Sequence, residues 1–370
     1  MKSKEEIPMD SETVYELPAA LPEAPAPEMR ASIRSPRKEL ARSMNRIGMV
    51  LLIVTLLPIV LSFPVGWILQ TFLAPVMSEE GLAVVQKVLS FALTQLIAIP
   101  IALCVGNTGT PHTIRQNGAP SQLSAKTTAK WVLIGFGCTY MVNYIFSFFF
   151  LFLQAIFQFE MNTDATAALV SSSNWLDQFL TFLLTAVSAP LLEELLFRGS
   201  ILAEAKRYGN WFALILSSVC FGLAHGNYQQ MFYAAAMGFF AGYLYLRSRS
   251  IFPPIFLHFS LNLVGACQGL LLGGVDLDAL LAEESLPALM ESLPSLAGIL
   301  IIALACLVLA ILGTVLFIVE LIRNRSQFRL QEEEPEFQLS RGEKAAGVLT
   351  SPVMIIFAGV ILALILVLAV

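Results

Sequence analysis

Charged residues are scarce in this sequence. Asp, Glu, Lys and Arg make up 13% of its 370 residues, whereas about 25% is usual for a soluble globular domain. Hydrophobic residues reach 56%, and the mean hydropathy is +0.73. A chain with so little charge and so much apolar surface is not expected to fold as an ordinary soluble domain. The sequence therefore predicts a protein that is built into a membrane.

Residues that build metal and redox sites are also few. The five cysteines never occur at C-x-x-C spacing, which gives no support to disulfides or thiolate-bound metals. Cysteines in apolar helices more often serve as small residues that pack against neighbouring helices. No Gly-x-Ser-x-Gly motif or Ser/Lys pair offers a nucleophile. The net charge of −5 argues against a nucleic-acid partner. The cysteines are Cys104, Cys138, Cys220, Cys267 and Cys306.

Long apolar stretches, by contrast, recur along the chain. A bilayer is crossed by about 20 apolar residues in a helix. We therefore expect an all-α membrane protein, a polytopic bundle of about nine transmembrane helices. The stretches are residues 47–73, 82–105, 131–157, 176–202, 211–224, 231–246, 255–272, 296–322 and 348–370.

Basic residues mark alternate connections between these stretches. They lie before the first stretch and after the second, fourth, sixth and eighth, while the other connections are acidic or neutral. Because Lys and Arg gather in cytoplasmic loops, we expect a plasma-membrane protein with a cytoplasmic N-terminus and an extracytoplasmic C-terminus. The exception is Lys87, which we expect to reach the membrane interface along its apolar stem.

Four regions follow from these patterns. Residues 1–45 are expected to be a disordered cytoplasmic tail whose basic end meets anionic lipid headgroups. Residues 46–174 are expected to form a scaffold of three helices, and residues 175–275 a core of four helices. Residues 276–370 comprise an acidic loop and two further helices. No cleavable signal peptide is expected, since the first apolar run begins near residue 47.

Ionisable residues interrupt the stretch 176–202. Each costs roughly 2–4 kcal/mol or more inside a membrane helix, so each is a functional hypothesis by default. Glu194 and Arg198 lie four residues apart, on one helical face, where they can pair. Glu193 is turned about 100° away and is left for another role. The alternative is a buried helix that carries only a structural ion pair.

Two of the three histidines also lie in apolar stretches. His225 ends one such run, and His258 has Asn262 four residues further on, on the same helical face. Each imidazole needs a polar partner at membrane depth. The third histidine, His112, lies in a polar loop, where we expect it to be solvated.

The spacing of these residues brings them to similar heights. Glu193 precedes Gly209 by sixteen residues and His225 follows it by sixteen, so antiparallel helices would place them side by side. His258 lies about 12 Å from its own turn and His225 about 24 Å from Gly209, at 1.5 Å per residue. Helix tilt, or an early helix end at Gly226-Asn227, must close that gap.

A carboxylate, two imidazoles and a carboxamide can activate water in two ways. In the first, Glu193, His225 and His258 would bind Zn²⁺, which lowers the pKa of a bound water. In the second, Glu193 takes a proton from water that His225 orients, while His258 and Asn262 stabilise the oxyanion. Both routes hydrolyse an amide or an ester, and the sequence leaves both open.

Three motifs occur in order along the core. They are Glu193-Glu194-Leu195-Leu196-Phe197-Arg198 (E-E-x-x-x-R), Phe221-Gly222-Leu223-Ala224-His225 (F-x-x-x-H) and His258-Phe259-Ser260-Leu261-Asn262 (H-x-x-x-N). Together they resemble the CPBP intramembrane metalloprotease family, which includes CAAX prenyl endoproteases of the Ras-converting type and relatives linked to bacteriocins. The resemblance covers about residues 175–275.

The resemblance implies roles for seven residues. Glu193, His225, His258 and Asn262 would be catalytic or metal-binding, and Glu194, Arg198 and Phe221 would support them. The implied function is an intramembrane endopeptidase that acts on a membrane-associated protein or peptide, prenylated or pheromone-like, among membrane lipids. A non-catalytic immunity or binding protein of the same fold is the alternative. An ion-coupled transporter is a third possibility, but transporters often show internal repeats, and no matching halves are found here.

Overall fold

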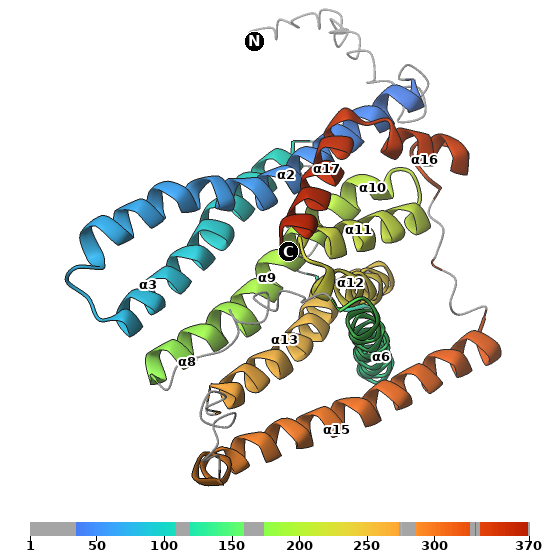
Figure 1. Cartoon of the computed structure of the whole chain (residues 1–370). Coiled ribbons are helices and arrows are strands. Elements are labelled where there is room, and N and C mark those ends of the chain that lie inside the picture. The colour runs from blue at the N-terminus through green and yellow to red at the C-terminus, as the bar shows by residue number, and fades with distance from the viewer. Residues whose placement is uncertain are drawn as a thin grey trace, which may run out of the picture. The chain divides into compact units, whose positions relative to one another are not determined.

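The computed structural model describes residues 35–108, 119–158, 174–273, 275, 286–325, 330 and 334–368. Within these ranges every regular element is a helix and none is a strand, which confirms the all-α prediction (Figure 1). The described helices belong to one compact unit that begins at Pro36. Residues 1–34 of the expected tail, His112 and the acidic loop around residues 276–285 lie outside the described residues.

The helices follow the order of the apolar stretches. The first segment is α2 (Pro36–Ile68) with the π-helical η1 (Leu69–Leu73), and the second is α3 (Glu79–Ala92), η2 (Leu93–Ala98) and α4 (Ile99–Gly106). Next come α6 (Ala125–Phe157) and a continuous run of α8 (Trp175–Thr181), η3 (Phe182–Ser188), α9 (Ala189–Leu196), η4 (Phe197–Leu202) and α10 (Ala203–Lys206). The rest are α11 (Asn210–Ala224), α12 (Tyr228–Ser248), α13 (Phe252–Leu272), α15 (Leu286–Arg323), α16 (Arg341–Leu349) and α17 (Pro352–Leu368).

The chain is a multi-pass membrane protein, but the count of nine spans is not confirmed. Among the described residues, six helices are long and apolar enough to cross a membrane, or seven if α16 and α17, bent by 63°, form one span. The described part of every predicted apolar stretch is helical, with a break between α16 and α17 in the last one. However, α11 has only 15 residues, and α12 is too polar to be counted as a span.

The first helix begins earlier than we expected. Residues 36–45, which we predicted to be part of a disordered tail, form the start of α2. Leu40 and Met44 are buried there. The carboxylate of Glu204, on α10, accepts hydrogen bonds from Ser43 and Arg46. This part of the tail is ordered because it packs against α10 and contributes to a buried ionic network.

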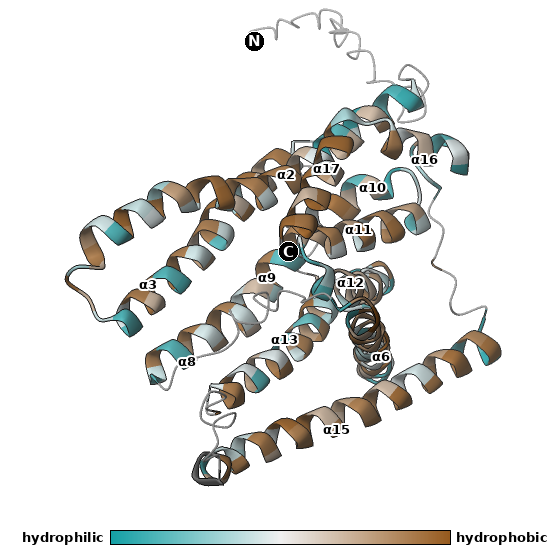
Figure 2. Cartoon of the chain, in the orientation of Figure 1, coloured by the Kyte–Doolittle hydropathy of each residue, from teal (hydrophilic) through white to brown (hydrophobic). Residues whose placement is uncertain are grey.

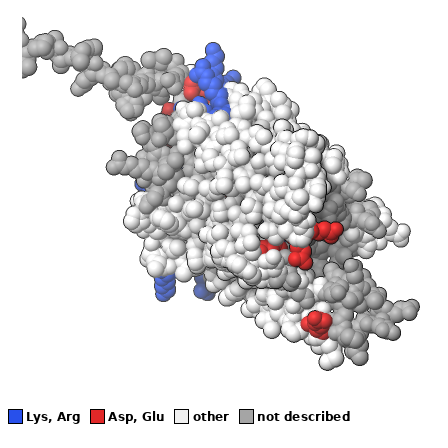
Figure 3. All heavy atoms as spheres, turned by 90° about the vertical axis from the view of Figure 1, so that its left-hand side faces the viewer, with Lys and Arg blue, Asp and Glu red and all other residues white. Residues whose placement is uncertain are grey.

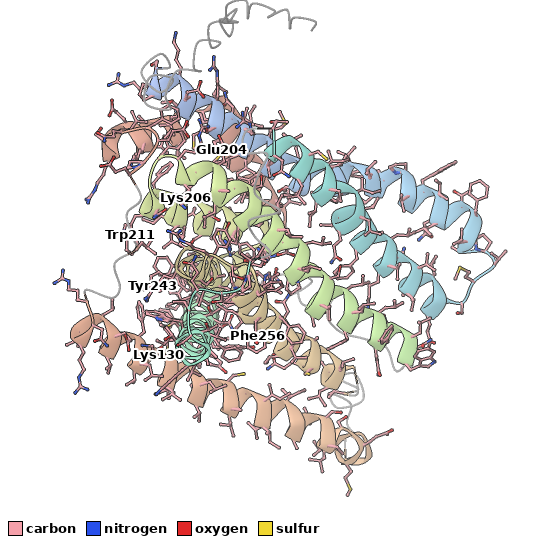
Figure 4. The ribbon with its side chains drawn as sticks, turned by 180° about the vertical axis from the view of Figure 1, so that it is seen from behind. Lys130, Glu204, Lys206, Trp211, Tyr243 and Phe256 are labelled. Atoms are coloured by element: carbon pink, nitrogen blue, oxygen red, sulfur yellow. The ribbon has the colours of Figure 1, made fainter. Side chains whose placement is uncertain are left out.

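Basic residues at several helix ends pair with glutamates along one side of the bundle. Arg207 donates to Glu336 at 2.8 Å, and Lys130 donates to Glu320 at 2.8 Å. Figure 4 shows Lys206, Trp211, Tyr243 and Lys130 following one another along one side. This clustering agrees with the charge alternation in the sequence, although the orientation of the termini in the membrane stays a prediction.

Charge is sparse elsewhere. The helices are mostly brown in Figure 2, which marks hydrophobic residues. The face in Figure 3 is largely uncharged, with Lys and Arg at its upper and lower margins and a few Asp or Glu side chains towards the right. Lys87, the exception in the charge pattern, is 16% exposed and donates to Asp177 at 2.6 Å. A carboxylate therefore satisfies Lys87, and its place at the membrane interface stays a prediction.

Helices α11 and α12 form a hairpin, and His225 lies at the start of its turn. Close packing between the two helices holds this hairpin together. A Cβ atom on Gly222 would lie 2.4 Å from the backbone oxygen of Met231 and 2.8 Å from the Cβ of Ala235. Gly238 returns the contact, since a Cβ there would meet Ser218 and Phe221. Small residues allow such close approach of helices in a membrane.

We predict that Gly222→Leu destabilises the protein. The larger side chain must push α12 away, and overpacking of this kind costs about 1–3 kcal/mol. The matched control is Gly359→Leu on α17, where a Cβ meets nothing within 4 Å. Thermal unfolding in detergent measures both. Equal melting temperatures for the two variants would contradict the packing described here.

Candidate functional site

The two adjacent glutamates lie on a short helix between irregular turns. Helix α9 has 8 residues, and the π-helical segments η3 and η4 flank it on either side. Single π-helical turns occur often at functional sites, since they leave backbone groups without their usual partners. The local backbone therefore departs from a regular helix on both sides of Glu193 and Glu194.

Proline at the start of α9 frees one carbonyl group. In η3, the N–H of Ala189 bonds to Leu184 O, five residues back. At the same spacing, residue 190 would bond to Thr185 O, but Pro190 has no N–H. The side-chain Nδ2 of Asn262 donates to Thr185 O instead, at 2.8 Å. This bond ties α13 to the segment that leads into the glutamates.

A buried ion pair confirms the predicted contact between Glu194 and Arg198. Nε of Arg198 lies 2.7 Å from Oε2 of Glu194, and both side chains are 0% exposed. A second bond joins Arg198 to Oε1 at 3.3 Å, and a third reaches Ser217 Oγ on α11 at 3.1 Å. The guanidinium also lies 5.5 Å from the ring centre of Phe221. With these contacts the charge is paired and hydrogen-bonded, as burial requires.

The same carboxylate orients His258. Nδ1 of His258 lies 3.1 Å from Oε1 of Glu194. A carboxylate only accepts, so Nδ1 carries the hydrogen, and in the neutral ring Nε2 keeps a lone pair. That Nε2 is 3.9 Å from Oε2 of Glu193. The distance is too long for a direct hydrogen bond and suits two groups that share one water molecule.

His225 is held at the end of α11 in a similar way. Its Nδ1 lies 2.9 Å from the carbonyl oxygen of Phe221 and must donate to it, which leaves Nε2 for other contacts. The chain reverses at Gly226, whose φ of 67° favours glycine. Asn227 then caps α12 and donates to His225 O at 2.9 Å. The early helix end that the sequence required is therefore present.

Phe221 lies between the two imidazoles. Its ring centre is 5.1 Å from that of His225 and 5.5 Å from that of His258, the latter edge to face. It is fully buried against Phe197. This position agrees with the supporting role that the sequence predicted, because the ring restricts both histidines.

One cavity of about 800 Å³ joins the predicted residues. Glu193, His225, His258 and Asn262 all line it, with further side chains from α3, α6, η3 and α12. The Glu193 side chain is 28% exposed and that of His258 is 4% exposed. Glu194 and Arg198 lie behind this lining, consistent with a supporting role.

The residues do not fit the predicted zinc site as they are arranged. A catalytic zinc takes three protein ligands. Within the described ranges, no group of three His, Cys, Asp or Glu side chains is close enough to hold a metal ion. The Nδ1 atoms of both histidines are bonded, to Phe221 O and to Glu194, so that only their Nε2 atoms could serve as ligands. The chemistry below is therefore derived without a metal.

Sequence reasoning missed several polar neighbours of the site. Ser217 holds Arg198, Thr185 O holds Asn262, and Asn227 holds the carbonyl of His225. Gln229 and Tyr233 also line the cavity. Each of these is a polar residue in or beside an apolar helix. That signal was visible in the sequence, but the helix faces that meet could not be read from it.

We predict opposite stability effects for the two adjacent glutamates. Glu194→Gln leaves the buried Arg198 without an opposite charge, which costs roughly 3–5 kcal/mol. Glu193→Gln removes a partly exposed carboxylate that pairs with no Lys or Arg among the described residues, so the melting temperature should hold or rise. Thermal unfolding of both variants in the same detergent provides the measurement. A larger loss for Glu193→Gln would refute this account of the site.

Comparisons with known proteins agree with the site. Residues 175–264 match the family described as Type II CAAX prenyl endopeptidase Rce1-like. A Bacillus subtilis (strain 168) protein named "Putative membrane peptidase YdiL" is 36% identical over 84 residues, which are 22% of this chain. The chain covers 34% of the length of that relative. No solved structure matches the chain. Residues 175–264, which hold all three motifs, are therefore similar to the Rce1-like family of Type II CAAX prenyl endopeptidases.

Proposed function

We propose that this protein is an intramembrane endopeptidase in which Glu193 activates the attacking water. One observation carries the proposal: Glu193, His225, His258 and Asn262 line a single cavity inside the bundle. The family of residues 175–264 supports a membrane protease. The proposed substrate is a membrane-associated protein or peptide.

The first step is water activation. A water molecule between Glu193 Oε2 and His258 Nε2, which are 3.9 Å apart, can donate one hydrogen to each. Glu193 takes a proton as the water oxygen bonds to the peptide carbonyl carbon. Since Nε2 of neutral His258 accepts, His258 orients this water. Its assignment as an oxyanion donor, expected from the sequence, is replaced in this proposal.

The second step is collapse of the tetrahedral intermediate. The oxyanion needs a donor, and Asn262 has one N–H left after its bond to Thr185 O. The C–N bond then breaks, and Glu193 returns its proton to the leaving amine. His225 Nε2 can accept a hydrogen bond from the substrate N–H and so align it. Water adds across one peptide bond, and the enzyme regains its starting state.

We predict that Glu193→Gln lowers kcat by about 10²- to 10⁴-fold, the range for a lost general base. The control is Glu80→Gln, an exposed carboxylate near the start of α3. Cleavage of membrane-derived peptides by purified protein is read by mass spectrometry, and melting temperature checks folding. A folded Glu193→Gln variant that cuts as fast as the parent would sink the proposal. If this variant cuts nothing but still complements a strain that lacks the protein, the protein acts by binding.

We also predict that activity survives removal of metal. The mechanism proposed above uses no metal, so dialysis against a chelator should leave kcat within about twofold, a change of less than 0.5 kcal/mol in barrier. Metal content is measured on the same sample. Loss of activity that follows loss of one equivalent of metal, and returns with it, would contradict the mechanism.

A further inference from the structure

The lining of the catalytic cavity carries many polar side chains among apolar ones, but almost no charged side chain. Among the described residues that line it, none is Lys or Arg, and Glu193 is the one carboxylate. Arg198, which lies on the turn after the two adjacent glutamates, is 0% exposed and paired with Glu194. The cavity therefore offers no cation to a guest that carries negative charge.

Carboxamides replace charges in this lining. Six of them face the cavity from three helices, in addition to the hydroxyl of Thr139. That hydroxyl is buried and has no hydrogen-bond partner among the described residues. The amides are Asn143 and Gln154 on α6, Gln229 and Gln230 on α12, and Asn262 and Gln268 on α13.

Some of these amides have donors and acceptors to spare. The side chains of Asn143, Gln154 and Gln268 make no hydrogen bond within the described part of the chain. A carboxamide has both N–H donors and an oxygen acceptor, as a peptide group does. An extended peptide inside a membrane protein must find partners for each N–H and C=O, because none comes from water there. The lining matches that need.

A row of residues along one face of α13 indicates how long a peptide the cavity can hold. His258, Asn262, Gly265 and Gln268 share one helical face and line the cavity. His258 and Gln268 are ten residues apart, which corresponds to about 15 Å. An extended chain advances about 3.3 Å per residue, so this row matches about five residues. Ser147 and Leu151 of the lining are exposed, so the cavity reaches the surface of the bundle beside α6.

We infer that the cavity binds an uncharged, extended internal segment of a polypeptide, and that it disfavours a free C-terminal carboxylate. A carboxylate within this row would lie in a low-dielectric site whose described lining offers no cation, and this holds with or without the charge of Glu193. The peptide groups of an internal segment would instead pair with the amides. This inference rests on the proposed function, since it names the kind of substrate that Glu193 would cut.

The test compares two five-residue peptides of Leu, Ala and Ser. Both carry a fluorophore on a blocked N-terminus, and they differ only in ending as a carboxamide or as a carboxylate. Binding is measured by fluorescence anisotropy with the full-length Glu193→Gln variant in nanodiscs, so that no cleavage occurs. We expect the carboxamide to bind at least about tenfold more tightly. Equal affinities, tighter binding of the carboxylate, or no binding of either overturns the inference.

Two substitutions locate the binding. In the Glu193→Gln background, Gln268→Leu should weaken binding of the carboxamide peptide about two- to tenfold, the value of one lost hydrogen bond. The matched control is Gln70→Leu, an exposed residue on η1 outside the cavity. Gln268→Arg should reverse the preference toward the carboxylate. Unchanged affinities for both Gln268 variants, with normal melting temperatures, would also overturn the inference.

Cleavage separates this inference from the proposed function. Wild-type protein is incubated separately with two peptides. One is a fifteen-residue peptide with the five-residue sequence at its centre, and the other is the five-residue peptide that ends in a free carboxylate. Faster cutting of the internal segment supports both. If neither is cut while the carboxamide preference holds in binding, the protease proposal fails alone. If both are cut at equal rates, the protease proposal stands and the inference about the substrate fails.

Discussion

The buried pair of Glu194 and Arg198 is the interaction on which the site depends. One guanidinium contacts the carboxylate, Ser217 and the face of Phe221, so it ties α9 and η4 to α11. The same carboxylate then holds Nδ1 of His258 from α13. An ion pair so deep is a weak source of stability by itself, since desolvation offsets much of the attraction. Its effect is to fix three helices and the tautomer of one histidine.

A second constraint is the hairpin of α11 and α12, in which α11 is shorter than an ordinary membrane span. Helix α11 ends at Ala224, before it could cross the bundle. His225 therefore lies within the bundle. Gly222 lets α12 approach closely, and Asn227 caps its first turn. The helices that fall short of an ordinary span are therefore the ones that deliver an imidazole to the cavity. Membrane proteins tolerate such breaks where the backbone lines a cavity.

Much of this could be predicted from the sequence, for identifiable reasons. Apolar runs fix helices, and a spacing of four residues fixes the contact between Glu194 and Arg198. Contacts between distant helices could not be predicted. Ser217 and Thr185 look like ordinary polar residues until α11 and η3 are placed against their partners. The helical start of residues 36–45 was missed for the same reason, since burial against α10 outweighs a polar composition.

The tautomer of His258 offers the most direct measurement of the central claim. The chain has only three histidines, so protein labelled with ¹⁵N-histidine gives spectra that single substitutions of His112 and His225 can assign. The account predicts a neutral His258 ring protonated at Nδ1, with Nε2 free to accept a hydrogen bond. Glu194→Gln should broaden or change these resonances. Protonation at Nε2, with Nδ1 unprotonated, would contradict the orientation of the whole site.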